Sequence, residues 1–154
     1  MSRSEAASGR RTEAPMDTTK TRVLVVDDDR FLQQFLRDNL EEAGFQVATA
    51  ADGRAAFLVI PEFNPDVVVM DVIMPGENGY RVSRALKELG SHATDAAPKI
   101  ILLTSRRVDD DPEREAMLLS FSRADAMLYK PCDPAHLRET ISRLLATSSR
   151  RNAW

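Results

Sequence analysis

Polar side chains with chemical uses stand at four places in this chain, each directly after a short apolar segment. Carboxylates, hydroxyl groups and an ammonium group are all present among them. Each signal alone is common in loops, where acids cap helices and Lys-Pro pairs form turns. Their combination, in order along one chain, is what indicates a site. The four places are Asp27-Asp28-Asp29, Asp71, Thr104-Ser105 and Lys130-Pro131.

These residue types suit phosphoryl chemistry. Carboxylates that lie close together repel one another and need a counter-ion. A hard divalent cation with oxygen ligands meets that need, and Mg²⁺ keeps several waters that other oxygens can replace. The cation, a lysine and a hydroxyl group can then neutralise a transferring phosphoryl group. One carboxylate can act as the nucleophile, which would give an aspartyl-phosphate.

Five segments that can form strands position these groups. Three of them, Val23–Val26, Val67–Met70 and Ile100–Leu103, are apolar on both faces. Such short runs are typical of strands buried on both sides in a parallel sheet. Gln46–Ala50 and Ala126–Tyr129 are weaker strand candidates.

Helical patterns separate the strands. An apolar stripe that begins at Phe31 predicts the first helix, which Gly44 ends. Asp52 can cap a second helix over Gly53–Ile60. Apolar residues at helical spacing mark a third and a last helix, and Pro112 can open the fourth. Strict alternation of five strands and five helices predicts a three-layer α/β/α sandwich around a five-stranded parallel sheet. In such sheets ligands bind beyond the carboxyl ends of the strands, where the four polar groups stand.

The length of 154 residues suits one domain with tails. We expect residues 1–20 to be a disordered extension, residues 21–146 to form the domain, and residues 147–154 to be a flexible tail. The net charge is −3, and because both ends are basic the segment between residues 22 and 147 carries −7. A body this acidic argues against a nucleic-acid partner.

Composition also limits where the protein works. No apolar run approaches the roughly 20 residues that span a bilayer, and the N-terminus lacks the apolar stretch of a secretory signal. The single cysteine, Cys132, excludes an internal disulfide. We therefore expect a cytoplasmic protein without a membrane partner.

Four motifs give the chain a resemblance to the response-regulator receiver domains, in particular to the stand-alone, chemotaxis-regulator-like members. They are VLVVDDD, MDVIMPGENGY, ILLTS and YKP, in family order over residues 21–146. The resemblance implies a flavodoxin-like (βα)5 fold and a two-component or phosphorelay switch rather than a dedicated enzyme. A partner histidine kinase or phosphotransfer protein would donate the phosphoryl group, and a downstream protein effector would bind in response.

The resemblance also assigns the metal ligands and the acceptor. Asp71 would accept the phosphoryl group and contribute to Mg²⁺ binding. Asp28 would bind Mg²⁺ directly and Asp27 through water, and the backbone carbonyl of Ile73 would complete the protein ligands. Asp29 lies one place further on, where we expect it to cap the first helix.

Two further positions would act on the phosphoryl group. Lys130 would pair with Asp71 or its phosphate, and the peptide bond from Lys130 to Pro131 would be cis. Thr104 would hydrogen-bond a phosphoryl oxygen. We also expect Ser105 and Arg106, which follow Thr104, to tune the lifetime of the phosphorylated form.

The chain departs from the family pattern on its output side. The family's switch residue is normally Tyr or Phe, but here it is Met127, and the flexible methionine could mute the usual motion. Tyr129 lies on the same strand face and could substitute. Arg123 stands where a glycine is usual, and the segment after Thr104 is longer than usual, over residues 106–111. It is either a solvated loop or a remodelled output surface.

Three functions remain open on the sequence. The first is the phosphorylation switch. The second is a phosphorylation-independent adaptor with a constitutive protein interface, which Met127 favours and the complete set of site residues opposes. The third, an aspartyl-phosphate enzyme acting on small molecules, would need a second carboxylate near the nucleophile, and Ile73 cannot serve. The resemblance further allows a homodimer through the fourth helix, last strand and last helix.

Overall fold

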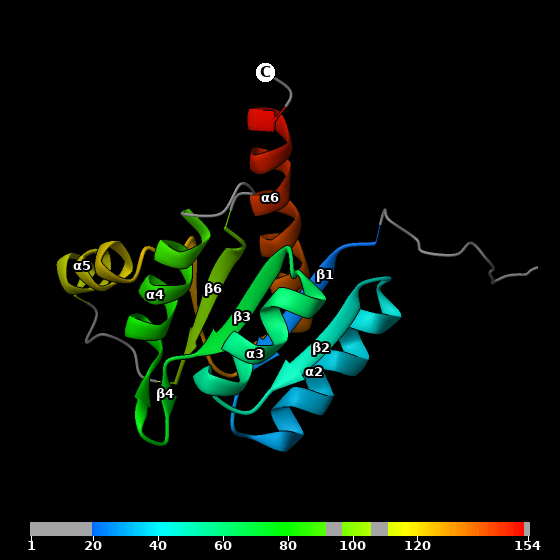
Figure 1. The fold of residues 1–154 in the computed structure, drawn as a ribbon, viewed down its shortest axis with the longest axis horizontal. Helices are drawn as coiled ribbons and strands as arrows, with labels where there is room; N and C mark the ends of the chain where they lie inside the picture. Colours follow the sequence, from blue (N-terminus) through cyan, green and yellow to red (C-terminus); the bar gives the residue numbers. More distant parts are fainter. Residues whose placement is uncertain (1–19, 92–96, 106–110, 153–154) are drawn as a thin grey trace, which may run out of the picture.

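The computed structural model describes residues 20–91, 97–105 and 111–152. The elements are β1 (Arg22–Val26), α2 (Arg30–Glu42), β2 (Gln46–Ala50), α3 (Gly53–Phe63), β3 (Val67–Asp71), β4 (Ile73–Met74), β5 (Glu77–Asn78), α4 (Gly79–Ser91), β6 (Lys99–Thr104), α5 (Pro112–Ser122), β7 (Ala126–Tyr129) and α6 (Pro134–Asn152). The five strands of the main sheet alternate with helices along these residues, as the periodicity predicts, and two short strands, β4 and β5, stand between β3 and α4 (Figure 1).

The main sheet has five strands in the order β2-β1-β3-β6-β7, and every neighbouring pair is parallel. The chain moves outward in one direction from β1 and in the other from β3, and in sheets of this kind ligands bind beyond the carboxyl ends of the two strands at such a point. Helices cover both faces of the sheet (Figure 1). The expected three-layer α/β/α sandwich is therefore confirmed.

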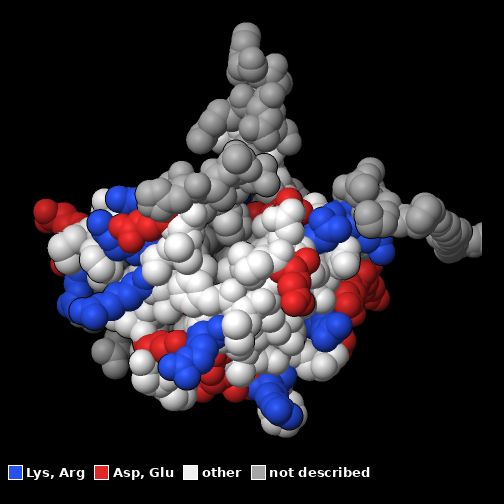
Figure 2. Space-filling model, in the orientation of Figure 1, with Lys and Arg blue, Asp and Glu red and all other residues white. Residues whose placement is uncertain are grey.

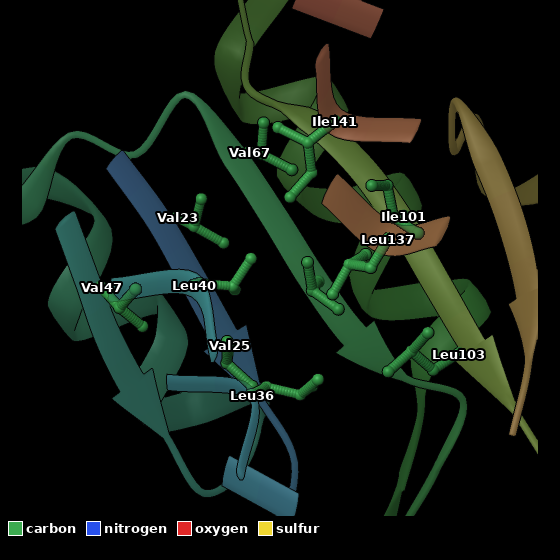
Figure 3. Close-up of a cluster of buried hydrophobic side chains, with 11 residues drawn as sticks. Val23, Val25, Leu36, Leu40, Val47, Val67, Ile101, Leu103, Leu137 and Ile141 are labelled. Carbon is green, nitrogen blue, oxygen red and sulfur yellow. The ribbon is translucent and has the colours of Figure 1, made fainter. Parts of the chain in front are cut away.

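Two apolar cores hold the layers together, one on each face of the sheet. Successive residues of β1 point to opposite faces, so Val23 and Val25 join the core under α2 and α6. Figure 3 shows this first core, in which Leu36 of α2 and Leu137 of α6 approach the strands. The second core packs the opposite face of the sheet against α3 and α4. Burying each such side chain stabilises the fold by about 1.5–3 kcal/mol.

Helix caps follow the sequence expectations. The carboxylate of Asp29 accepts hydrogen bonds from the backbone N–H groups of Phe31 and Leu32, so it caps α2. The Asp52 side chain accepts from the Ala55 N–H and caps α3. Pro112 stands at the start of α5.

Helix α3 is longer than predicted, because it continues past Ile60 through Pro61 to Phe63. Proline lacks the backbone N–H group, but near the end of a helix its absence removes only one hydrogen bond of the last turn. The N–H of Asn64, in the left-handed conformation with φ 54°, donates to the Ile60 carbonyl and closes the helix. Phe63 packs against the second core, which holds the extra turn in place.

Two further differences concern short or terminal elements. A two-stranded antiparallel hairpin, β4–β5, follows β3 and was not predicted, because two-residue strands carry no periodicity. Gly76 makes its turn at φ +73°. Helix α6 reaches Asn152, past residue 146 where the domain was expected to end. Over the described ranges, no helix combines the length and apolarity that crossing a membrane requires.

Candidate functional site

Three carboxylates meet at the carboxyl ends of β1 and β3. The register pairs Val26 with Met70, so the next residues, Asp27 and Asp71, lie side by side at the sheet edge. Asp28 joins them, and ligand oxygens of the three side chains all lie within 4.8 Å of one another. Asp27 is only 1% exposed and Asp71 6%, whereas Asp28 is open to solvent. The cluster is buried on its protein side and accessible on the other.

Lys130, which directly follows β7, completes the cluster. Its Nζ lies 3.2 Å from Oδ2 of Asp27 and 3.3 Å from Oδ1 of Asp71. The backbone holds it there, because its N–H donates to the carbonyl of Thr104 at 2.8 Å. The peptide bond to Pro131 is cis, as expected.

Burial and charge act against each other at this site. Burial raises the pKa of Asp27, and the neighbouring Asp71 carboxylate raises it further, although the Asp29 N–H and Lys130 partly compensate. Burial alone would lower the pKa of Lys130, but the carboxylates of Asp27 and Asp71 together raise it above its ordinary value. Lys130 is therefore an ammonium group at neutral pH. With all groups ionised, three carboxylates and one ammonium leave two negative charges uncompensated, which a divalent cation would neutralise.

The geometry suits a magnesium ion. Oxygen ligands lie about 2.1 Å from Mg²⁺, so opposite ligands of one ion are about 4 Å apart. The carboxylates of Asp27, Asp28 and Asp71 meet that span with small adjustments, directly or through water. Because Asp28 faces solvent, waters and other oxygens can fill the remaining positions. These three residues therefore fit a magnesium ion.

Ile73 lies on β4 beside the acceptor carboxylate. Its N–H donates to Oδ1 of Asp71 at 3.4 Å, and its side chain is 57% exposed. The backbone of Ile73 therefore lies next to the carboxylate cluster. Its carbonyl as a metal ligand stays a prediction.

The hydroxyl groups lie on the other side of Asp71. Asp71 pairs with Leu103 across β3 and β6, so Thr104, one residue further on, ends β6 at the same edge. Thr104 is buried, whereas Ser105 is exposed. Arg106, the other residue expected to tune the phosphorylated lifetime, lies outside the described residues, as does most of the lengthened segment.

The expected switch position contacts a helix rather than the site. The hydroxyl of Tyr80, in the first turn of α4, donates to Sδ of Met127 at 3.9 Å, and Met127 packs against the second core. Tyr129 uses its hydroxyl to donate to a carboxylate oxygen of Glu115 on α5. Met127 and Tyr129 thus connect β7 to two helices on the same side of the sheet.

Sequence reasoning missed two residues that shape the segment after Asp71. A Cβ on Gly79 would lie 2.5 Å from the Asp71 carbonyl oxygen, and the Gly79 N–H donates to the Val72 carbonyl at 2.7 Å. Only glycine permits this close approach of α4 to the end of β3. Glu77 on β5 accepts from the Gly53 N–H at 2.5 Å and ties the hairpin to α3. Both residues stand in the motif MDVIMPGENGY, but the sequence does not show that Glu77 contacts Gly53 or that α4 approaches the end of β3 so closely.

Comparisons with known proteins agree with this geometry. Residues 23–142 match the family model of the response regulator receiver domain. The DNA-binding response regulator MtrA of Mycobacterium tuberculosis is 34% identical over 137 residues, covering 89% of this chain and 54% of that protein. Response regulator MprA of Mycolicibacterium vanbaalenii is 42% identical over 125 residues, covering 81% of this chain and 49% of that protein.

Solved structures of response regulators also match this chain. The chemotaxis protein CheY4 of Vibrio cholerae aligns with a TM-score of 0.70 and 30% identity, covering 81% of this chain and 98% of that one. The chain belongs to the response regulator receiver domain family of two-component systems. Phosphorylation and magnesium binding are typical of that family. The chain spans about half the length of the curated relatives it matches.

Proposed function

We propose that this receiver is a phosphorylation switch that accepts a phosphoryl group on Asp71 from a partner histidine kinase or phosphotransfer protein. The observation that carries the proposal is the position of the Asp71 carboxylate, which lies 3.3 Å from the Lys130 ammonium and within the three-carboxylate cluster. This carboxylate is buried, has an ammonium group at one oxygen and is reached from solvent on the side of Asp28. Such a carboxylate is placed to act as a nucleophile.

The chemistry is a single transfer between two residues. A carboxylate oxygen of Asp71 attacks the phosphorus of the donor phosphohistidine, the P–N bond breaks, and its electron pair returns to the imidazole. The Lys130 ammonium neutralises charge on the phosphoryl oxygens, and the Thr104 hydroxyl donates a hydrogen bond to one of them. When bound by Asp27, Asp28, Asp71 and the Ile73 carbonyl, Mg²⁺ supplies the remaining positive charge.

The output is a change in protein binding. Phosphorylation would shift the population of a face built from α5, β7 and α6, and a downstream protein effector would bind the shifted form. Ser105 and Arg106 would set how long the phosphorylated form persists. We propose that the protein acts in the cytoplasm through protein binding, without nucleic acid, membrane or a separate enzymatic substrate.

A second function, a phosphorylation-independent adaptor, is favoured by one specific observation. The aromatic ring expected at the switch position is replaced by Met127, and Tyr129 is engaged with Glu115 instead. A fixed β7–α5 contact would present the same surface with or without phosphate.

Direct phosphorylation distinguishes the two functions. The purified protein is incubated with acetyl phosphate and Mg²⁺, and its intact mass is measured beside an Asp71→Asn control. The switch predicts the gain of one phosphoryl group in the wild type alone, lost when EDTA removes Mg²⁺. A folded wild-type protein that gains no mass would overturn the switch and leave the adaptor.

A further inference from the structure

Helix α3 lies on the outside of the domain and exposes apolar surface at the middle of its outer face. Its sequence, GRAAFLVIPEF, contains only two charged residues. Gly53 and Ala56 face the core, yet Leu58 on the outer side is 73% exposed. Most of the other apolar side chains of α3 pack against the second core, which leaves Leu58 as its exposed large apolar residue. Over the described residues nothing covers the outer face of α3.

The exposed residues of α3 form a regular stripe. Arg54, Leu58 and Glu62 are spaced at i, i+4 and i+8, so they lie on one face of the helix over about 12 Å. All three are exposed, and Pro61 is exposed beside them. Within the described part of the chain, neither Arg54 nor Glu62 forms an ion pair. Figure 2 shows a largely uncharged area over α3, with charged groups at its margins.

This stripe is complementary to itself. A two-fold axis through Leu58 would place a second α3 antiparallel to the first, with the two leucines in contact at the centre. Arg54 would then face Glu62 of the partner subunit, and Glu62 would face Arg54 of the partner subunit. Isologous interfaces require this kind of pairing, in which i meets j and j meets i.

We propose that the outer face of α3 is a self-association surface for a second copy of this chain. The charge pattern selects this occupant, because an unrelated partner would not need opposite charges placed symmetrically about an apolar centre. A helix of 11 residues offers little area, so the dimer is weak and depends on concentration. The residues of the proposed phosphorylation site lie outside α3, so the surface is separate from that site. They are Asp27, Asp28, Asp71, Thr104 and Lys130.

Charge reversal tests the pairing. Sedimentation velocity over a concentration series measures the dimer dissociation constant of the wild type. Arg54→Glu turns both ion pairs into repulsive contacts and should weaken the dimer about tenfold or more, and Glu62→Arg should do the same. The double variant restores both pairs and should return the constant close to the wild-type value. Leu58→Ser removes the apolar centre and should also weaken the dimer.

A mixing experiment makes the test more specific. Equal amounts of the Arg54→Glu and Glu62→Arg variants, each weakened alone, should associate with one another, because each supplies the charges the other lacks. Arg37→Glu and Glu41→Arg on α2 make the same charge changes at an exposed site elsewhere and should leave association unchanged. All the altered side chains are exposed, and thermal melts confirm that each variant folds.

Each outcome decides the proposal. A wild type that stays monomeric up to millimolar concentration would overturn it. So would a dimer that is insensitive to residues 54 and 62, as expected for pairing through α5, β7 and α6. A double variant that remains dissociated, or two single variants that do not associate on mixing, would also overturn it.

Discussion

The carboxyl ends of β1 and β3 and the junction of β7 with α5 are built in opposite ways. At the first, strand register alone places Asp27 beside Asp71, and both carboxylates are buried. At the second, all four residues of β7 are only half-buried, and single side-chain contacts such as Tyr129 to Glu115 connect the strand to its helix. The carboxylate site is therefore positioned by the backbone register of two strands. The junction of β7 with α5, which we call the output region, depends on a few replaceable side chains.

The largest effect should come from Lys130, because it contacts both carboxylates. Lys130→Ala removes the fixed cation beside Asp71, and the rate of phosphorylation by acetyl phosphate should fall about 100-fold or more. Stopped-flow or quenched mass measurements give the rate. Lys87→Ala is the matched control, because it breaks an ion pair away from the site, in which Nζ of Lys87 lies 2.7 Å from Oδ2 of Asp125. A similar rate loss in the control would indicate general destabilisation instead.

A change in stability with pH should follow from Asp27. Because its pKa is raised in the folded protein, its contribution to stability is present at low pH and is lost as pH rises through that pKa. Asp27→Asn cannot ionise, so without Mg²⁺ it should melt at a higher temperature than the wild type at neutral pH. The difference should shrink below pH 3.8, the ordinary value for the group. Equal melting temperatures at neutral pH would contradict this explanation.

The output region should respond to loss of one hydroxyl group. Tyr129→Phe removes the hydrogen bond to Glu115, and the free energy of unfolding should fall by about 1 kcal/mol with phosphorylation unaffected. Tyr80→Phe is the control, since its hydroxyl donates only to the weak acceptor Sδ of Met127. Urea denaturation measures both. A larger loss in the Tyr80 variant would reverse the ranking of the two contacts.

The smallest expected effect is a gain in folding stability. Arg123 ends α5 in the left-handed conformation, with φ 59°, which costs a residue with a Cβ about 1 kcal/mol. Arg123→Gly removes that cost but adds flexibility to the unfolded chain, so stability should rise by about 0.5 kcal/mol. Asn64→Gly is a comparison at another helix end with φ 54°. Loss of stability in the Arg123 variant would show that its side chain makes a stabilising contact.

The sequence predicted which strand ends meet better than it predicted the packing around them, for a physical reason. Parallel strands of similar length end at one edge, so residues following Val26, Met70 and Leu103 had to meet once the alternation was recognised. The contact from Tyr129 to Glu115 depends on where α5 packs, which no local pattern encodes. The close approach of Gly79 and the two-residue strands of the hairpin likewise arise from tertiary packing.

The most direct test of the central claim follows the switch from the site to the output region. Backbone amide spectra are compared before and after adding beryllium fluoride, which forms a phosphoryl-like group on an aspartate. With Mg²⁺ present throughout, the account predicts that beryllium fluoride causes chemical-shift changes at Asp71 and Thr104 that continue through Tyr129 to Glu115, and none in Asp71→Asn. Changes confined to the site, with β7 and α5 unaltered, would contradict the switch and favour a constitutive adaptor.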